Sequence, residues 1–149
     1  MPKTLPFVRN PNWAKTMLLP MPRATADELA LLVHLALATM RAGVGSVRNA
    51  QTLTQTMIPT GFIAEAGYGA ATYDQLVVAE AAISAAFDRG RDTGEWRLDE
   101  GAASLFAVIV TTYDEQLRQA PLWAVAEASE RLDRFQAGEA YRRPDRKLA

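Results

Sequence analysis

The sequence predicts an all-α protein, a compact bundle of about five helices preceded by an extended, proline-rich N-terminal arm. Apolar residues recur three and four positions apart along most of the chain, which is the spacing of a helix that buries one face. Residues typical of helix caps precede these segments and glycines follow them, and no strand pattern alternates with them. With 149 residues, 49% of them hydrophobic and 22% charged, the chain fits one globular domain. We expect an arm over residues 1–24, a helical domain over 25–138 and a basic tail over 139–149.

The arm combines helix-breaking residues with large apolar ones. Its five prolines predict an extended or irregular chain, because proline lacks an N–H and restricts the residue before it. A solvated linker would not carry so many large apolar side chains. We therefore expect the arm to lie on its own domain or on a second subunit. The expected partner-binding residues are Phe7, Trp13, Met17 and Leu18.

The first helix is expected to run from a capping box at Thr25 and Glu28 to Gly43. Its core positions have helical spacing: Leu29, Leu32, Val33, Ala36, Leu37 and Met40. The segment is also apolar at Leu31 and Leu35. This predicts burial on more than one face, as in a central helix.

Two further helices follow. Ser46 can cap the second, which Pro59 and Gly61 should kink or stop, and a short turn is expected before the next glycines. A capping box at Thr72 and Gln75 opens the third, which is expected to end near residue 87.

The polar residues 88–95 predict a loop, with Trp96 holding it to the core. Asp99 is the expected N-cap of a helix through about residue 119. The β-branched interior of that segment is also compatible with a buried strand, but its length and polar continuation favour a helix. Pro121 fits the first turn of a last helix.

Few residues are suited to catalysis. Without cysteine, the chain has no disulfide, thiolate metal ligand or thiol nucleophile. His34 is the only histidine and has apolar neighbours on its own helix face, which predicts a core or subunit-interface histidine bonded to a carbonyl or hydroxyl group. A titrating switch or a general base is the alternative. We expect no enzymatic activity, no cofactor and no metal; an enzyme or ligand site would need polar groups converging around His34.

Charge is unevenly distributed along the chain. Residues 1–26 carry four basic side chains and no acidic one, residues 27–139 carry 16 acidic and eight basic ones, and the last ten residues carry four basic and one acidic. Basic ends indicate an anionic partner, contacts between neighbouring subunits, or simply solvated termini. The candidate nucleic-acid contacts are Arg48, Arg142, Arg143, Arg146 and Lys147.

Two stretches carry a family resemblance: LLVHLALATMRAGVGSVRNAQTLTQTM and GEWRLDEGAASLFAVIVTTYDEQLRQAPLWAVAEASERL. Together they resemble a group of small helical bacterial proteins of unassigned role that are labelled Fis-like transcriptional regulators. The resemblance covers roughly residues 31–132 and rests on apolar patterning and the turn at Trp96. It assigns a role to no individual residue.

These observations predict a non-enzymatic helical protein–protein interaction or accessory module that forms homo-oligomers or binds another protein. The alternative is a DNA-binding transcriptional regulator that uses the basic termini. The chain has no apolar run of about 18 residues and no apolar region typical of a secretion signal at its N-terminus. We therefore expect a cytoplasmic location and no membrane contact.

Overall fold

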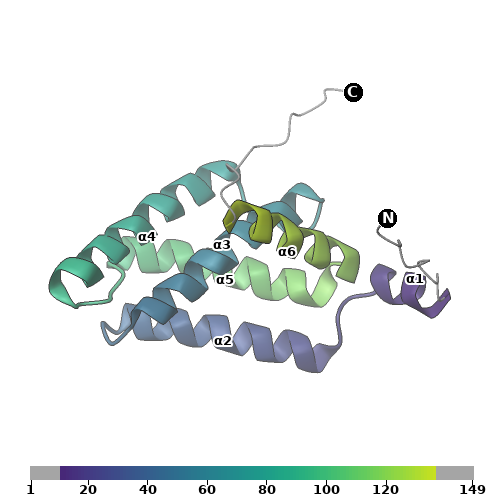
Figure 1. The fold of residues 1–149 in the computed structure, drawn as a ribbon, viewed down its shortest axis with the longest axis horizontal. Coiled ribbons are helices and arrows are strands. Elements are labelled where there is room, and N and C mark those ends of the chain that lie inside the picture. The colour runs from purple at the N-terminus through teal and green to yellow at the C-terminus, as the bar shows by residue number, and fades with distance from the viewer. Residues whose placement is uncertain (1–10, 137–149) are drawn as a thin grey trace, which may run out of the picture.

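The computed structural model describes residues 11–136, of which residues 11–14 are described by their backbone alone, and it is helical without a strand in that part (Figure 1). The all-α prediction is therefore confirmed for the described residues, with six helices where about five were expected. The helices are α1 Pro11–Leu18, α2 Arg23–Arg41, α3 Val47–Glu65, α4 Tyr73–Thr93, α5 Glu100–Gln119 and α6 Leu122–Gln136.

The central helix is α3, which packs against α2, α4, α5 and α6. Every residue from 56 to 63 is buried, so this stretch meets protein on all sides. In contrast, α2 lies along the lower edge of the molecule in Figure 1 and packs on α3 and α5. The prediction that α2 is buried on more than one face is wrong. None of the helices in the described part is long and apolar enough to span a bilayer.

Helix α3 passes Pro59 and Gly61 without ending, so of the predicted kink or stop the stop does not occur. A proline inside a helix removes one backbone hydrogen bond and costs about 3 kcal/mol. Packing of both residues against the surrounding helices offsets this cost. Helix α3 ends instead at Glu65, before Gly67 and its positive φ of 101°.

Three predicted N-caps are confirmed. Ser46 and Thr72 accept backbone N–H groups three residues on and complete capping boxes, and the Asp99 carboxylate accepts the N–H of Ala102 at 2.7 Å. The predicted cap at Thr25 is wrong, because α2 begins at Arg23. The first hydrogen bond of α2 runs from the Ala26 N–H to the carbonyl of Pro22 at 3.1 Å, and no side chain caps the helix start.

The third helix extends beyond the predicted end at residue 87. Helix α4 runs to Thr93 and ends at Gly94, whose φ of 75° provides the left-handed cap. Trp96 does hold the following loop to the core, as predicted: its ring packs edge-on against Phe87, with centroids 5.6 Å apart. The ring lies so close over Gly90 that a Cβ there would stand 2.3 Å from Trp96 Cδ2. The absence of a side chain at Gly90 therefore allows this loop to close.

The extended-arm prediction is wrong for residues 11–18, which form α1. Pro11 occupies the first helical position, where its missing N–H has no intrahelical partner to lose, and the next proline follows the helix end. Helix α1 contacts α6, and the Leu122 N–H donates to the carbonyl of Leu19 at 2.8 Å. This part of the chain thus lies on its own domain, while residues 1–10 lie outside the described residues.

Helix α5 forms as predicted, with Ile109 and Val110 of its β-branched interior in the core. Phe106, Ile109 and Val110 are almost fully buried. Near its end, the buried Gln116 amide donates to the carbonyls of Thr60 at 3.0 Å and Tyr68 at 2.8 Å. This amide ties the end of α3 and the following loop to α5.

Candidate functional site

The candidate functional site is the outward face of α2, where three leucines lie in solvent. Leu31, Leu32 and Leu35 are 60%, 57% and 54% exposed. All three were predicted to be buried, and the structure corrects this. The reason is the edge position of α2, since only its opposite face contacts α3 and α5.

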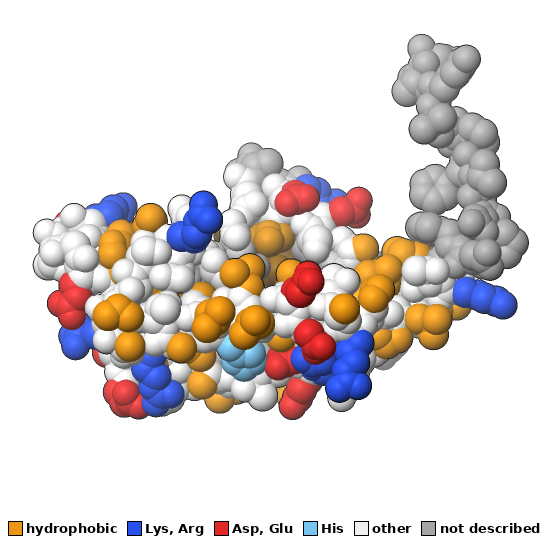
Figure 2. Space-filling view, turned by 90° about the horizontal axis from the view of Figure 1, so that it is seen from below, with side chains coloured by type: hydrophobic (Ala, Val, Ile, Leu, Met, Phe, Trp, Pro, Cys, Tyr) orange, Lys and Arg blue, Asp and Glu red, His pale blue; other side chains and the backbone are white. Residues whose placement is uncertain are grey.

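Leu31 and Leu35 belong to a continuous line of exposed residues, which we call the α2 seam, and Leu32 lies beside this line. Its members are spaced alternately four and three residues apart: Ala24, Glu28, Leu31, Leu35, Ala38 and Ala42. All six are exposed. Figure 2 looks onto this side of the molecule and shows hydrophobic side chains around the pale-blue histidine. A repeat that averages 3.5 residues is the spacing with which helices pair in coiled coils.

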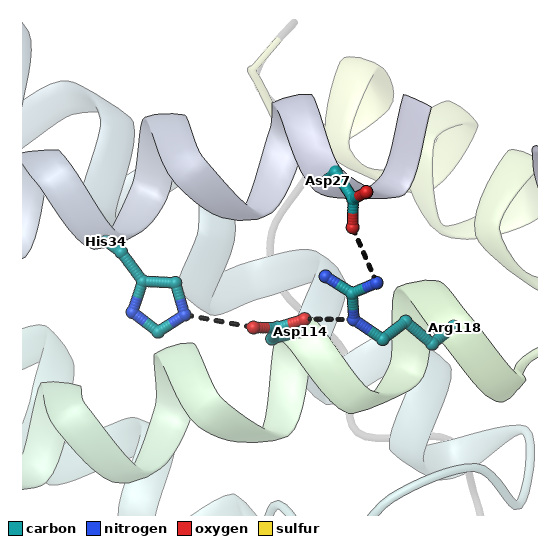
Figure 3. Close-up of polar contacts among 4 residues, drawn as sticks. All are labelled: Asp27, His34, Asp114 and Arg118. Carbon is teal, nitrogen blue, oxygen red and sulfur yellow. Dashed lines mark hydrogen bonds and ion pairs between the residues drawn. The ribbon is translucent and has the colours of Figure 1, made fainter. Parts of the chain in front are cut away.

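A row of polar contacts borders the seam on the side of α5 (Figure 3). His34 Nε2 lies 3.0 Å from Asp114 Oδ2, and Arg118 Nε donates to Asp114 Oδ1 at 2.7 Å. Arg118 Nη1 donates to Asp27 Oδ1, also at 2.7 Å. His34 is thus a half-exposed histidine bound to a carboxylate, and the predicted core position with a carbonyl or hydroxyl partner is wrong. Its partner lies 80 positions away in the chain, where local spacing gives no signal.

The electrostatics of this row favour the charged forms of Asp114 and Arg118. Partial burial raises the pKa of the Asp114 carboxyl, but the hydrogen bonds and charges of His34 and Arg118 outweigh it and lower the pKa below the ordinary 3.8. Hydrogen bonds from Arg118 to Asp27 and Asp114 in turn raise the pKa of the Arg118 guanidinium. The ion pair between Arg118 and Asp27 therefore joins α5 to α2, and the row holds the α2 seam in place.

A second feature is an apolar groove of about 340 Å³ between α3, α4 and the end of α6. Its lining includes Met57, Leu76, Phe87 and Phe135, but none of the residues in the row around His34. The row around His34 and the groove are therefore separate parts of the surface. Among the described residues, no group of three or more His, Cys, Asp or Glu side chains could hold a metal ion.

The partner-binding residues predicted in the arm are only partly visible. Leu18 is 69% exposed and Met17 is partly buried in α1. The backbone of Trp13 belongs to α1, its side chain is not described, and Phe7 lies outside the described residues. The α2 seam was missed, although its alternating spacing of three and four residues could have been read from the sequence.

Of the predicted nucleic-acid contacts, only Arg48 lies within the described residues. Arg48 is exposed in the first turn of α3, while Arg142, Arg143, Arg146 and Lys147 lie outside the described residues. Residues 11–136 contain 15 acidic and ten basic side chains, a net charge of −5. Five of their arginines are paired with carboxylates: Arg41, Arg91, Arg97, Arg118 and Arg131. The described part thus carries a charge unfavourable to phosphate binding.

No family model, no curated protein and no solved structure matches the chain significantly. Function must therefore be inferred from the molecule's own surface.

Proposed function

We propose that this chain is a non-catalytic protein–protein interaction module that binds a partner helix along the α2 seam. The observation that carries the proposal is the exposure of Leu31, Leu32 and Leu35 on one helix face. Single exposed apolar residues are ordinary, but contiguous ones rimmed by polar groups are typical of interaction sites. Here the row of Asp27, His34 and its partners forms such a rim.

Burial of these leucines by a partner contributes substantially to the free energy of binding. Full burial of a leucine contributes about 2 kcal/mol, so covering the remaining half of each contributes about 1 kcal/mol. The three together give about 3 kcal/mol before any contribution from the partner. That amount offsets part of the entropy lost on association, which is at least about 4 kcal/mol. A partner must therefore bring its own apolar surface.

The shape of the α2 seam favours a helix as that partner. Residues spaced alternately three and four positions apart present knobs that fit the holes between side chains of a facing helix. Alanines at both ends of the seam let the backbones approach closely, and the leucines fill the centre. A flat sheet edge would not match this spacing.

Site-specific photo-crosslinking in the cell that expresses the protein tests the proposal. A photoreactive phenylalanine replaces Leu35, and the matched control replaces Val78, which is 59% exposed on α4. The proposal expects discrete adducts from position 35 that are absent at position 78. No adduct at position 35, or the same pattern at both positions, would overturn it.

The alternative function, a DNA-binding regulator that uses the basic termini, stays a prediction. It expects duplex DNA binding that weakens steeply with salt and is lost when Arg142 and Arg143 are changed to alanine. Fluorescence anisotropy of labelled duplex at two salt concentrations measures this directly. Binding that is insensitive to salt would contradict it.

A further inference from the structure

The two ends of the α2 seam are complementary to each other. If a second copy of α2 runs antiparallel, with Leu31 facing Leu35 of the second copy, the rest of the seam pairs without a conflict. Glu28 then faces Ala38, and Ala24 faces Ala42. Large residues meet in the centre, while small ones leave room at the ends. The glutamate lies beside a methyl group and can extend its carboxylate into water.

The charges that flank the α2 seam favour the same direction. Asp27, His34 and Arg41 follow one another at intervals of seven along one border of the seam. In antiparallel helix pairs, equivalent flanking positions face each other across the interface. Asp27 therefore meets Arg41 of the second copy at each end. His34 meets its own counterpart in the middle.

Existing ion pairs in the chain extend this complementarity. Asp27 accepts from Arg118, and Arg41 donates to Glu100 at 2.6 Å, but both side chains stay about half exposed. Each can therefore accept or donate further bonds. Antiparallel pairing would create an alternating row in which Arg118 and Asp27 of one copy continue into Arg41 and Glu100 of the other. Such networks are more favourable than isolated exposed pairs.

A parallel arrangement conflicts with the same residues. Parallel helices in register place each seam residue against its own counterpart, so Glu28 would face Glu28 at the interface. Like charges facing each other inside an interface are destabilising. In this arrangement Asp27 would also lie far from Arg41.

We propose that the α2 seam binds a second copy of this chain as an antiparallel helix pair, with the two-fold axis passing midway between the levels of Leu31 and Leu35. The proposal rests on the interaction function proposed above and names its partner. A two-fold axis makes the interface self-complementary, so that each contact occurs twice. The seam is free for this pairing because no described helix covers it (Figure 2).

Disulfide trapping tests both the pairing and its direction, and the absence of cysteine leaves only the introduced thiols to react. Leu31→Cys and Leu35→Cys variants of the full chain, one of them tagged, are equilibrated alone and mixed in a glutathione redox buffer. Facing positions can form a disulfide, whereas residues shifted by four along the helix lie beyond its reach. We expect the mixed disulfide in the mixture to exceed either self-disulfide roughly tenfold. A Val78→Cys variant sets the background from random collision.

Each alternative outcome has one meaning. Strong self-disulfides from each variant alone would overturn the antiparallel direction and indicate a parallel pair. Disulfides no stronger than those of Val78→Cys would overturn the self-pairing altogether.

The photo-crosslinking experiment at position 35 separates this proposal from the proposed function. An adduct of twice the 16.3 kDa chain mass supports self-pairing. An adduct of a different mass leaves the interaction function in place and refutes the second copy as its partner.

Discussion

The contact between Gly90 and Trp96 yields a prediction whose size follows from the structure. A Cβ on Gly90 would lie 2.3 Å from Trp96 Cδ2 and 2.4 Å from Cε2, far inside van der Waals contact. The Gly90→Ala variant must therefore move the indole ring by about 1 Å or more, since normal carbon contacts are about 3.5 Å. This movement disturbs the edge-on contact with Phe87.

Unfavourable and favourable contributions together set the change in the free energy of unfolding of Gly90→Ala. Inserting a methyl group into a closely packed site costs about 1–3 kcal/mol, and a weakened aromatic contact adds about 0.5–1.5 kcal/mol. Replacing glycine by alanine inside a helix returns about 1 kcal/mol. We expect the free energy of unfolding to fall by about 0.5–3.5 kcal/mol, which lowers Tm by roughly 1–14 °C in a domain of this size.

Urea denaturation followed by circular dichroism and tryptophan fluorescence measures this change. Gly101→Ala is the matched control, because its nearest neighbour is Asp99 Oδ1 at 3.6 Å and its site in α5 is exposed. The control is expected to keep or slightly raise the stability. If Gly90→Ala is as stable as the unmodified chain while the control behaves as expected, the packing of Trp96 over α4 is refuted.

Three further predictions concern the row at α5, the caps and the α2 seam. Because the pKa of Asp114 is lowered in the folded chain, its stabilisation is present above the ordinary value of 3.8 and lost as the pH falls through the lower folded value. Urea midpoints between pH 7 and pH 2 should show a weaker acid dependence for Asp114→Asn, and an unchanged acid limb would contradict the ion pairs. Thr72→Ala should lower the free energy of unfolding by about 1 kcal/mol, whereas Thr25→Ala should leave it almost unchanged, as measured by thermal unfolding. Equal losses would show that Thr25 does cap α2. Leu35→Ala removes about 1 kcal/mol of apolar burial from each copy, or about 2 kcal/mol from the pair, which raises the dimer Kd about 30-fold. Sedimentation equilibrium measures this Kd, and an unchanged value would show that Leu35 is not in the contact.

The sequence by itself determined the class of the fold and the starts of three helices. Ser46, Thr72 and Asp99 cap helices where their local patterns predicted caps, and α5 is a helix despite its β-branched interior. These signals act within one turn of helix, because a cap bonds a backbone group only two or three residues away. Local chemistry is therefore sufficient to place them.

Only the tertiary structure decided which apolar faces are covered. The leucines of α2 have the same local pattern as core residues, and their exposure depends on distant helices that pack elsewhere. By contrast, α3 continues through Pro59 because four other helices surround it. Burial is a property of neighbours, and those neighbours come from remote parts of the chain.

The polar row beside the α2 seam also arises from the packing of helices that are distant in the sequence. His34 and Asp114 are 80 residues apart, and Asp27 and Arg118 are 91 apart, so no spacing within one helix could predict their contacts. The packing of α2 against α5 brings these charges within 3.0 Å and lowers the pKa of Asp114. The seam residues could be read from the chain, but their exposure and the ion pairs beside them arise from helix packing alone.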